Sequence, residues 1–451
     1  MLDKSGVDDE RRGTVGGQVE LQNTERVDRG LVARYLLVIG IILLASSRTV
    51  ADTSEDDASH RKVHWYVDRG LNLEVHRVGL LEQVAGPVSD LLVHAQAGFR
   101  LSADAADSAG DDQGAESGGV RRAYIRVGGE FWPWSRPVKF YLEIGVINGQ
   151  FSLDTSYLTF PAIPYVGDLK VGQLDLPMSM DALSSSFARP FMERSLPVEA
   201  FVPSAKGGAL LANRTADQDV TWALGWFADG TNTEDGENNN SPTRAAGRLT
   251  WLASAGDEQG LPLVHFGVYG SYMYSANRRI DYDSRAESRW APKLFDTGAI
   301  DGRGAVVLGN EMAAAKGPWS VQGELLAARV PGASGGDADF GGAYVFGTWC
   351  LTGEPRPYDR TAGYFGTVTP QQPVAYGTHN IGAWEVALRL SYLNLVDGAV
   401  RGGRGVELMP GLNWYLTRNF RLQLSYGYTH VEDGPQNGNL HLVQTRFDVS
   451  L

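Results

Sequence analysis

Residues 384–392 read WEVALRLSY, and apolar and polar side chains alternate through the whole stretch. The apolar set is Trp384, Val386, Leu388, Leu390 and Tyr392, and the set between them is Glu385, Ala387, Arg389 and Ser391. A period of two places successive side chains on opposite faces of a β-strand. The stretch therefore predicts a strand with one apolar and one polar face.

The same alternation recurs along the chain, for example in residues 91–101, 138–146, 220–228, 420–430 and 441–451. We count about 16 such strands, an even number, as single-chain bacterial outer-membrane barrels have. A soluble sandwich would turn the apolar faces inward, whereas a membrane barrel turns them toward lipid.

The connections between these strands favour the barrel, because short and long ones alternate. Residues 134–137, 316–318 and 417–419 are short, and the long, polar or irregular ones are 102–120, 177–206, 229–242, 275–303 and 331–340. Aromatic residues at the strand ends, such as Trp319 and Trp414, stand where an interfacial girdle is expected. We predict an all-β fold, a transmembrane antiparallel β-barrel over residues 91–451.

The composition and the motifs exclude several other classes of protein. The net charge of −13 argues against a nucleic-acid partner, and the lone Cys350 excludes an intramolecular disulfide and a thiolate metal cluster. No H-E-x-x-H, paired C-x-x-C or P-loop pattern occurs in the sequence. We therefore expect neither an enzyme nor a bound cofactor or metal.

The N-terminal region is typical of an exported protein. Residues 34–51 read RYLLVIGIILLASSRTVA, a basic residue, an apolar run and a small-residue cleavage site. The run is shorter than the roughly 20 residues of a membrane helix. We predict that residues 1–51 are an N-terminal extension and signal peptide, with translation starting near Leu31 or Val32, and that residues 52–90 form the mature N-terminal segment.

One long connection has an unusual composition. Residues 187–203 read FARPFMERSLPVEAFVP, in which three prolines prevent both a regular ladder and an uninterrupted helix. The segment also carries large apolar side chains, among them Phe187, Phe191, Met192 and Phe201, and two arginines.

Several ordered blocks resemble the phosphate-selective porins of the O and P type. They are RRAYIRVGG (121–129), LKVGQ (169–173), FMERSLPVEAF (191–201), LTGEPRPY (351–358), GAWEVALRLS (382–391) and GLNWYLTRNFRLQLSY (411–426). The resemblance implies a trimeric, 16-stranded porin in the bacterial outer membrane that passively conducts small anions such as phosphate, surrounded by lipid and lipopolysaccharide. It also implies that the third extracellular loop, here residues 177–206, and a late periplasmic connection, here 353–382, fold into the lumen.

On this reading, basic residues of the inward faces and of the inner loop would line the pore and bind anions. The candidates are Arg122, Arg126, Lys139, Lys170, Arg189, Arg194, Lys206, Arg248, Arg389, Arg421 and Arg446. An inward arginine can equally be a structural ion-pair member, because acids such as Glu385 and Asp448 share that face.

The family commonly has a lysine where this chain reads GQLD, which places Asp175 at that position. This departure keeps a second function open, a general or other-substrate channel of weak ion selectivity on the same barrel.

Overall fold

The structure is a computed structural model that describes residues 61–66, 70–76, 92–110, 115–131, 136–147, 150–228, 242–256, 260–333 and 336–450. The predicted signal peptide and its cleavage site lie outside these residues.

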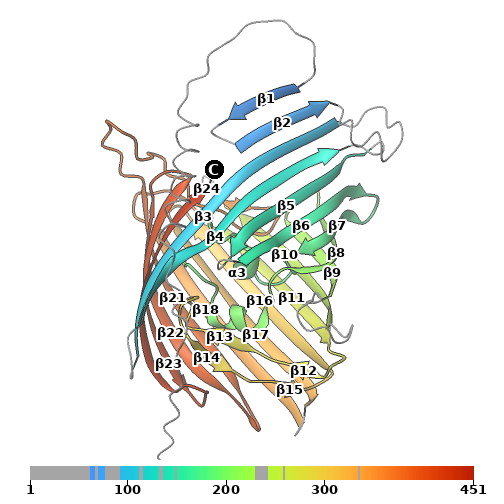
Figure 1. Cartoon of the computed structure of the whole chain (residues 1–451), viewed down its shortest axis with the longest axis vertical. Coiled ribbons are helices and arrows are strands. Elements are labelled where there is room, and N and C mark those ends of the chain that lie inside the picture. Colours follow the sequence, from blue (N-terminus) through green and yellow to red (C-terminus); the bar gives the residue numbers. More distant parts are fainter. Residues whose placement is uncertain are drawn as a thin grey trace, which may run out of the picture. The chain divides into compact units, whose positions relative to one another are not determined.

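Eighteen strands form one antiparallel sheet, and all of them except β1 and β2 pair in a closed ring (Figure 1). The strands of the ring are β3 (Leu92–Gly110), β4 (Ala115–Phe131), β5 (Val138–Ile147), β6 (Gln150–Ile163), β7 (Gly167–Leu174), β8 (Lys206–Arg214), β9 (Val220–Ala228), β10 (Thr243–Ala255), β11 (Leu263–Tyr274), β16 (Gly304–Lys316), β17 (Trp319–Ala333), β18 (Gly336–Cys350), β21 (Ala383–Asp397), β22 (Val400–Tyr415), β23 (Phe420–Glu432) and β24 (Gly438–Ser450).

The ring closes where β24 pairs with β3, from Leu440 opposite Gly110 to Ser450 opposite Arg100. The remaining edge of β3 pairs with β2 (Gly70–His76), which pairs with β1 (Arg61–Tyr66). Closure satisfies the strand edges within the ring, as a membrane barrel requires.

The short elements belong to the connections. They are α3 (Met180–Leu183), α4 (Leu196–Phe201), β12 (Arg279–Ile280), β13 (Asp283–Arg285), β14 (Lys293–Asp296), β15 (Ile300–Asp301), β19 (Tyr358–Asp359) and β20 (Tyr364–Phe365). Among the described residues, no helix is long and apolar enough to cross a membrane.

The two faces of the wall are opposite to those of a soluble sandwich. In β21, Leu388 and Leu390 are 53% and 50% exposed, while Arg389 between them is 1% exposed. In β9, Leu224 and Trp226 are 58% and 61% exposed, while Phe227 is fully buried. Apolar side chains that face outward around polar ones are what a lipid-embedded barrel requires, so the predicted fold class is confirmed.

Two predicted loops are wrong. Residues 102–110 and 115–120 belong to β3 and β4, and the segment 331–340 is mostly strand in β17 and β18. Both segments are rich in glycine, alanine and acids, which have low strand propensity. Strand pairing overrides that propensity, on both sides for residues 102–108 of β3 and across the hairpin of β17 and β18 for the segment 331–340.

The aromatic residues at the short-turn ends form stacked pairs between neighbouring strands. Trp319 stacks on Trp349 with a centroid distance of 4.7 Å, and Trp384 stacks on Trp414 at 5.0 Å. Trp319 and Trp349 are 55% and 40% exposed. This position suits the predicted interfacial girdle.

Candidate functional site

The connection between β7 and β8, residues 175–205, lies inside the ring of strands, and we call it the inner loop. Its two short helices, α3 and α4, are held by wall residues. Glu324 of β17 accepts hydrogen bonds from the Ser179 hydroxyl at 3.0 Å and from the Asp181 amide at 2.8 Å, which fixes the start of α3. The Ser179 hydroxyl also accepts a bond from the Ala182 amide and thereby caps that helix.

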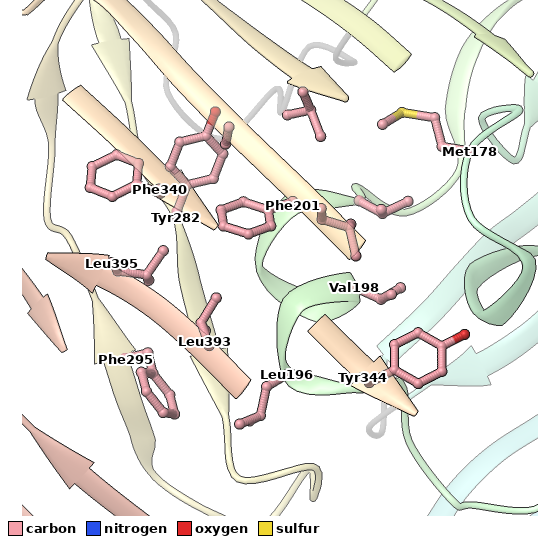
Figure 2. Close-up of a cluster of buried hydrophobic side chains, with 14 of the residues drawn as sticks. Met178, Leu196, Val198, Phe201, Tyr282, Phe295, Phe340, Tyr344, Leu393 and Leu395 are labelled. Atoms are coloured by element: carbon pink, nitrogen blue, oxygen red, sulfur yellow. The ribbon is translucent and has the colours of Figure 1, made fainter. Parts of the chain in front are cut away.

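One side of the inner loop is an apolar core against the wall. Leu196, Val198 and Phe201 of α4 are at most 2% exposed. Figure 2 shows them among Phe340, Tyr344, Leu393 and Leu395 of the wall and Tyr282 and Phe295 of the β11–β16 connection. The rings of Phe201 and Tyr282 meet edge-to-face at 5.3 Å. The prolines leave the loop backbone free of the ladder, and this apolar surface attaches it instead.

Three wall arginines bind the backbone of the inner loop. Arg421 donates to the carbonyl oxygens of Ser186, Phe187 and Arg189 at 2.8–3.0 Å and pairs with Asp448. Arg389 donates to the Glu193 carbonyl, pairs with Glu287 and lies 4.2 Å from the centroid of the Phe191 ring.

Arg446 completes this set by donating to the Met192 carbonyl and pairing with the Glu193 carboxylate at 2.7 Å. All three arginines are at most 4% exposed. The sequence analysis proposed that these three arginines contact a passing anion. The structure corrects this, because their donors are occupied by the loop.

Arg248 holds the other connection that enters the lumen, residues 351–382 between β18 and β21. It pairs with Glu311 at 2.6 Å and donates to the carbonyls of Ala362 and Gly363. Arg356 of this connection donates to the Ala188 carbonyl of the inner loop and pairs with Glu385. The two connections thus meet inside the barrel. Arg248 is 7% exposed and uses its donors in these contacts, although it also lines the second cavity described below.

The space that remains open contains a cavity of about 670 Å³ between the inner loop and strands β4 to β6. Its basic residues are Arg122, Arg126, Arg189 and Arg194, and its acidic residues are Glu143, Asp154, Asp175, Glu193 and Glu199. Tyr124, Tyr141, Tyr157 and Tyr364 also line it. It therefore presents guanidinium, carboxylate and phenol groups to a solute.

Several of these charges are already paired. Arg126 donates to Glu143 at 2.9 Å, and Glu143 also accepts a bond from the Tyr141 hydroxyl at 2.6 Å. Asp154 accepts a bond from the Tyr124 hydroxyl at 2.9 Å. Burial, together with the nearby Glu193 carboxylate, raises the pKa of Glu199 to about 8, which keeps this acid mostly neutral at neutral pH.

Two arginines at this cavity keep buried donors unused. The Nε and Nη1 atoms of Arg189 and the Nε of Arg122 have no hydrogen-bond partner among the described residues. Burial lowers the pKa of Arg189 to about 9, and nearby Arg194 and Arg122 act in the same direction while Asp181 opposes them. A bound anion would satisfy these donors, because buried guanidinium groups favour charged acceptors.

A second cavity of about 380 Å³ lies beside the first, among strands β6 to β9 and the β18–β21 connection. Lys170 and Arg214 line it, and the Lys170 ammonium lies 5.1 Å from the centroid of the Tyr157 ring. The two cavities share five residues, namely Thr155, Tyr157, Asp175, Leu183 and Tyr364. These five residues mark the passage between the cavities.

The last two candidates lie outside both cavities. Lys139 is exposed on the face of β5 that also carries Tyr141 and Glu143, and Lys206 is half-buried at the start of β8. The sequence analysis missed Glu287 and Tyr364. Both lie in irregular connections, where no periodicity assigns a face.

Comparison with protein families matches residues 95–450 to phosphate-selective porin O and P. The chain belongs to that family. The bacterial outer membrane is therefore its location, and the family is one of channels rather than of enzymes.

This porin is 27% identical over 351 residues to an uncharacterized protein of Caulobacter vibrioides, covering 73% of this chain and 68% of the relative. Among solved structures it is similar to OprB of Pseudomonas putida, at 10% identity and a TM-score of 0.51 over 79% of this chain and 94% of that one. It is also similar to the anion-selective porin of Comamonas acidovorans, at 10% identity and a TM-score of 0.49 over 80% of this chain and 100% of that one. The likeness to OprB supports the barrel fold alone.

Proposed function

We propose that this porin passively conducts small anions, phosphate among them, and that Arg122, Arg189 and Arg194 form its anion site. The observation that supports this proposal is the set of buried guanidinium donors at the larger cavity that no carboxylate satisfies. Arg194 donates hydrogen bonds to the carbonyls of Val202 at 3.3 Å and Ala182 at 3.4 Å. Its charge is therefore not neutralised by a direct ion pair with a described residue.

The other charged residues of the cavity also favour an anion over a cation. Glu143 is paired with Arg126, Glu193 is paired with Arg446, and Glu199 is mostly neutral. Three guanidinium groups then face two carboxylates, Asp154 and Asp175. In a narrow space that excludes bulk water, an excess of basic groups lowers the energy of an anion more than the same charges on the surface would.

The test is the reversal potential of the purified porin in a planar bilayer under a salt gradient. We expect Arg122→Gln combined with Arg194→Gln to move the reversal potential toward cations. Arg278→Gln is the matched control, because Arg278 is an exposed arginine outside both cavities that pairs with Asp301. A double variant with the wild-type reversal potential would refute the anion site.

A weakly selective general channel is the second candidate function. Asp175 supports it, since this acid stands at the passage between the two cavities, where the family commonly has a lysine. A wild-type reversal potential near zero, unchanged in the double variant, would favour this alternative.

We also propose that the porin forms homotrimers within outer-membrane lipid and lipopolysaccharide. Family membership supports this assembly. The mass of the detergent-solubilised protein by light scattering tests it, and a monomeric mass would contradict it.

A further inference from the structure

The passage between the two cavities is lined by a carboxylate. Asp175 follows directly after β7 and lines both cavities, to which its side chain is exposed although the barrel encloses it. It makes no hydrogen bond or ion pair within 4.0 Å in the described part of the chain. Its charged neighbours are the basic residues Arg194, Arg122 and Lys170 and the acidic residues Asp154 and Glu143. Its carboxylate can therefore interact with a solute that moves between the two cavities.

The same cavity carries the guanidinium groups of Arg122, Arg189 and Arg194. Both signs of charge thus stand within one space of about 670 Å³. An anion without a positive group is attracted by the arginines and repelled by Asp175. A cation without a negative group is attracted by Asp175 and repelled by the arginines. A solute that carries both charges can satisfy both sets of groups.

The aromatic residues of the passage favour an ammonium group beside Asp175. Tyr157 and Tyr364 line both cavities together with Asp175, and each lies near enough to interact electrostatically with it. The ammonium of Lys170 lies 5.1 Å from the centroid of the Tyr157 ring, which shows that a cation can approach this ring. A carboxylate close to two phenol rings is a suitable environment for a primary ammonium.

We propose that the solutes this porin favours are zwitterions with a carboxylate and an ammonium group, such as free amino acids and short peptides. The solute carboxylate contacts Arg122, Arg189 and Arg194, and the solute ammonium passes Asp175. This inference rests on the proposed anion site and adds a second group that the solute must carry. Opposed charges then discriminate against solutes that carry only one of them.

The experiment measures uptake of three radiolabelled solutes of similar size into proteoliposomes that contain the full chain. The solutes are β-alanine, a zwitterion; butyrate, an anion; and butyramide, which is neutral. We expect β-alanine to enter several-fold faster than butyrate. Asp175→Asn should bring the two rates to about the same value, because it removes both the attraction for ammonium and the repulsion of the anion.

Two further variants serve as controls. Asp175→Glu keeps the charge and should keep the preference for β-alanine. Asp281→Asn removes an exposed carboxylate outside both cavities and should leave all three rates unchanged. Heat-modified migration on gels verifies that each variant folds.

The outcomes separate this inference from the proposed function. Butyrate entering at least as fast as β-alanine, with no effect of Asp175→Asn, would overturn the inference while the anion site stands. If the double variant Arg122→Gln with Arg194→Gln has the same butyrate uptake and the same reversal potential as the wild type, the anion site itself is overturned. Equal rates for all three solutes in the wild type would overturn both in favour of a general channel.

Discussion

Replacing Arg421 with glutamine should loosen the inner loop without opening the wall. Arg421 is completely buried, donates to three loop carbonyls and pairs with Asp448. Its hydrogen bonds to the loop all go to backbone carbonyls, and its guanidinium also lies 5.0 Å from the centroid of the Phe187 ring. Glutamine is too short to reach these acceptors together.

The size of the effect follows from what is left unpaired. Removing one partner of a buried ion pair typically costs about 3–5 kcal/mol, because the other charge stays buried. Each 1.4 kcal/mol is about tenfold in an equilibrium. The ratio of attached to released loop should therefore fall by about two to three and a half orders of magnitude at this end of the loop. Asn413 and Gln423 still donate to the Pro190 carbonyl and limit the release.

Two assays measure this change. Single-channel recordings should show added open-channel noise and transient steps to higher conductance, and protease should cut the loop near residues 186–189 faster. Arg421→Gln combined with Asp448→Asn should restore part of the stability of the folded form on gels, because no charge then stays buried alone. Arg401→Gln is the control, an exposed arginine on the neighbouring strand β22.

A quiet single-channel trace together with wild-type protease resistance in Arg421→Gln would refute this account of the arginine. The inner loop would then be held by its apolar core alone.

Leu224→Arg places a charge on the outer face, where Leu224 is 58% exposed. For a site at mid-membrane, the free energy of barrel folding in lipid vesicles should become less favourable by roughly 2–4 kcal/mol. Folding as efficient as that of the wild type would contradict the lipid-facing assignment. Phe201→Ala should loosen α4 at a cost of about 3–5 kcal/mol, since Phe201 is 2% exposed and packs on Tyr282, and thermal unfolding checks it against Val120→Ala on the exposed surface. Enclosure inside the barrel raises the pKa of Asp175, with Asp154 and Glu143 acting in the same direction and Arg194 and Arg122 opposing, so this acid gains its proton at a higher pH than a solvated aspartate. Anion permeability should therefore rise as pH falls from neutral to mildly acidic values, and the reversal potential of Asp175→Asn should lack the part of the pH dependence that Asp175 contributes; an identical pH profile in the two proteins would argue against the role of Asp175.

The sequence predicted the wall well, because alternation depends on neighbouring residues alone. The stretch WEVALRLSY becomes part of β21, with Leu388 and Leu390 outward and Arg389 inward as its pattern requires. It predicted less well where composition and pairing conflict, as in residues 102–120 and 331–340. There the hydrogen bonds of neighbouring strands outweigh low local propensity.

The inner loop shows where sequence reasoning reached its limit. Its prolines and aromatic residues indicated a segment that does not pair with the wall, and the segment does carry the apolar core around Phe201. Which charged group holds it, however, depends on contacts between residues more than 200 positions apart, such as Arg421 with Phe187.

By itself, the sequence determined that this chain is a β-barrel with an apolar outer face and a polar inner face, and its resemblance to the porin family implied a loop directed into the lumen. Only the tertiary structure decided which inward arginines are used for structure and which face the open cavities. The physical reason is that a period of two assigns a side chain to a face but not to a partner. Arg389 and Arg122 have the same pattern in sequence, yet one is surrounded by loop backbone and the other keeps a buried donor unused beside the cavity.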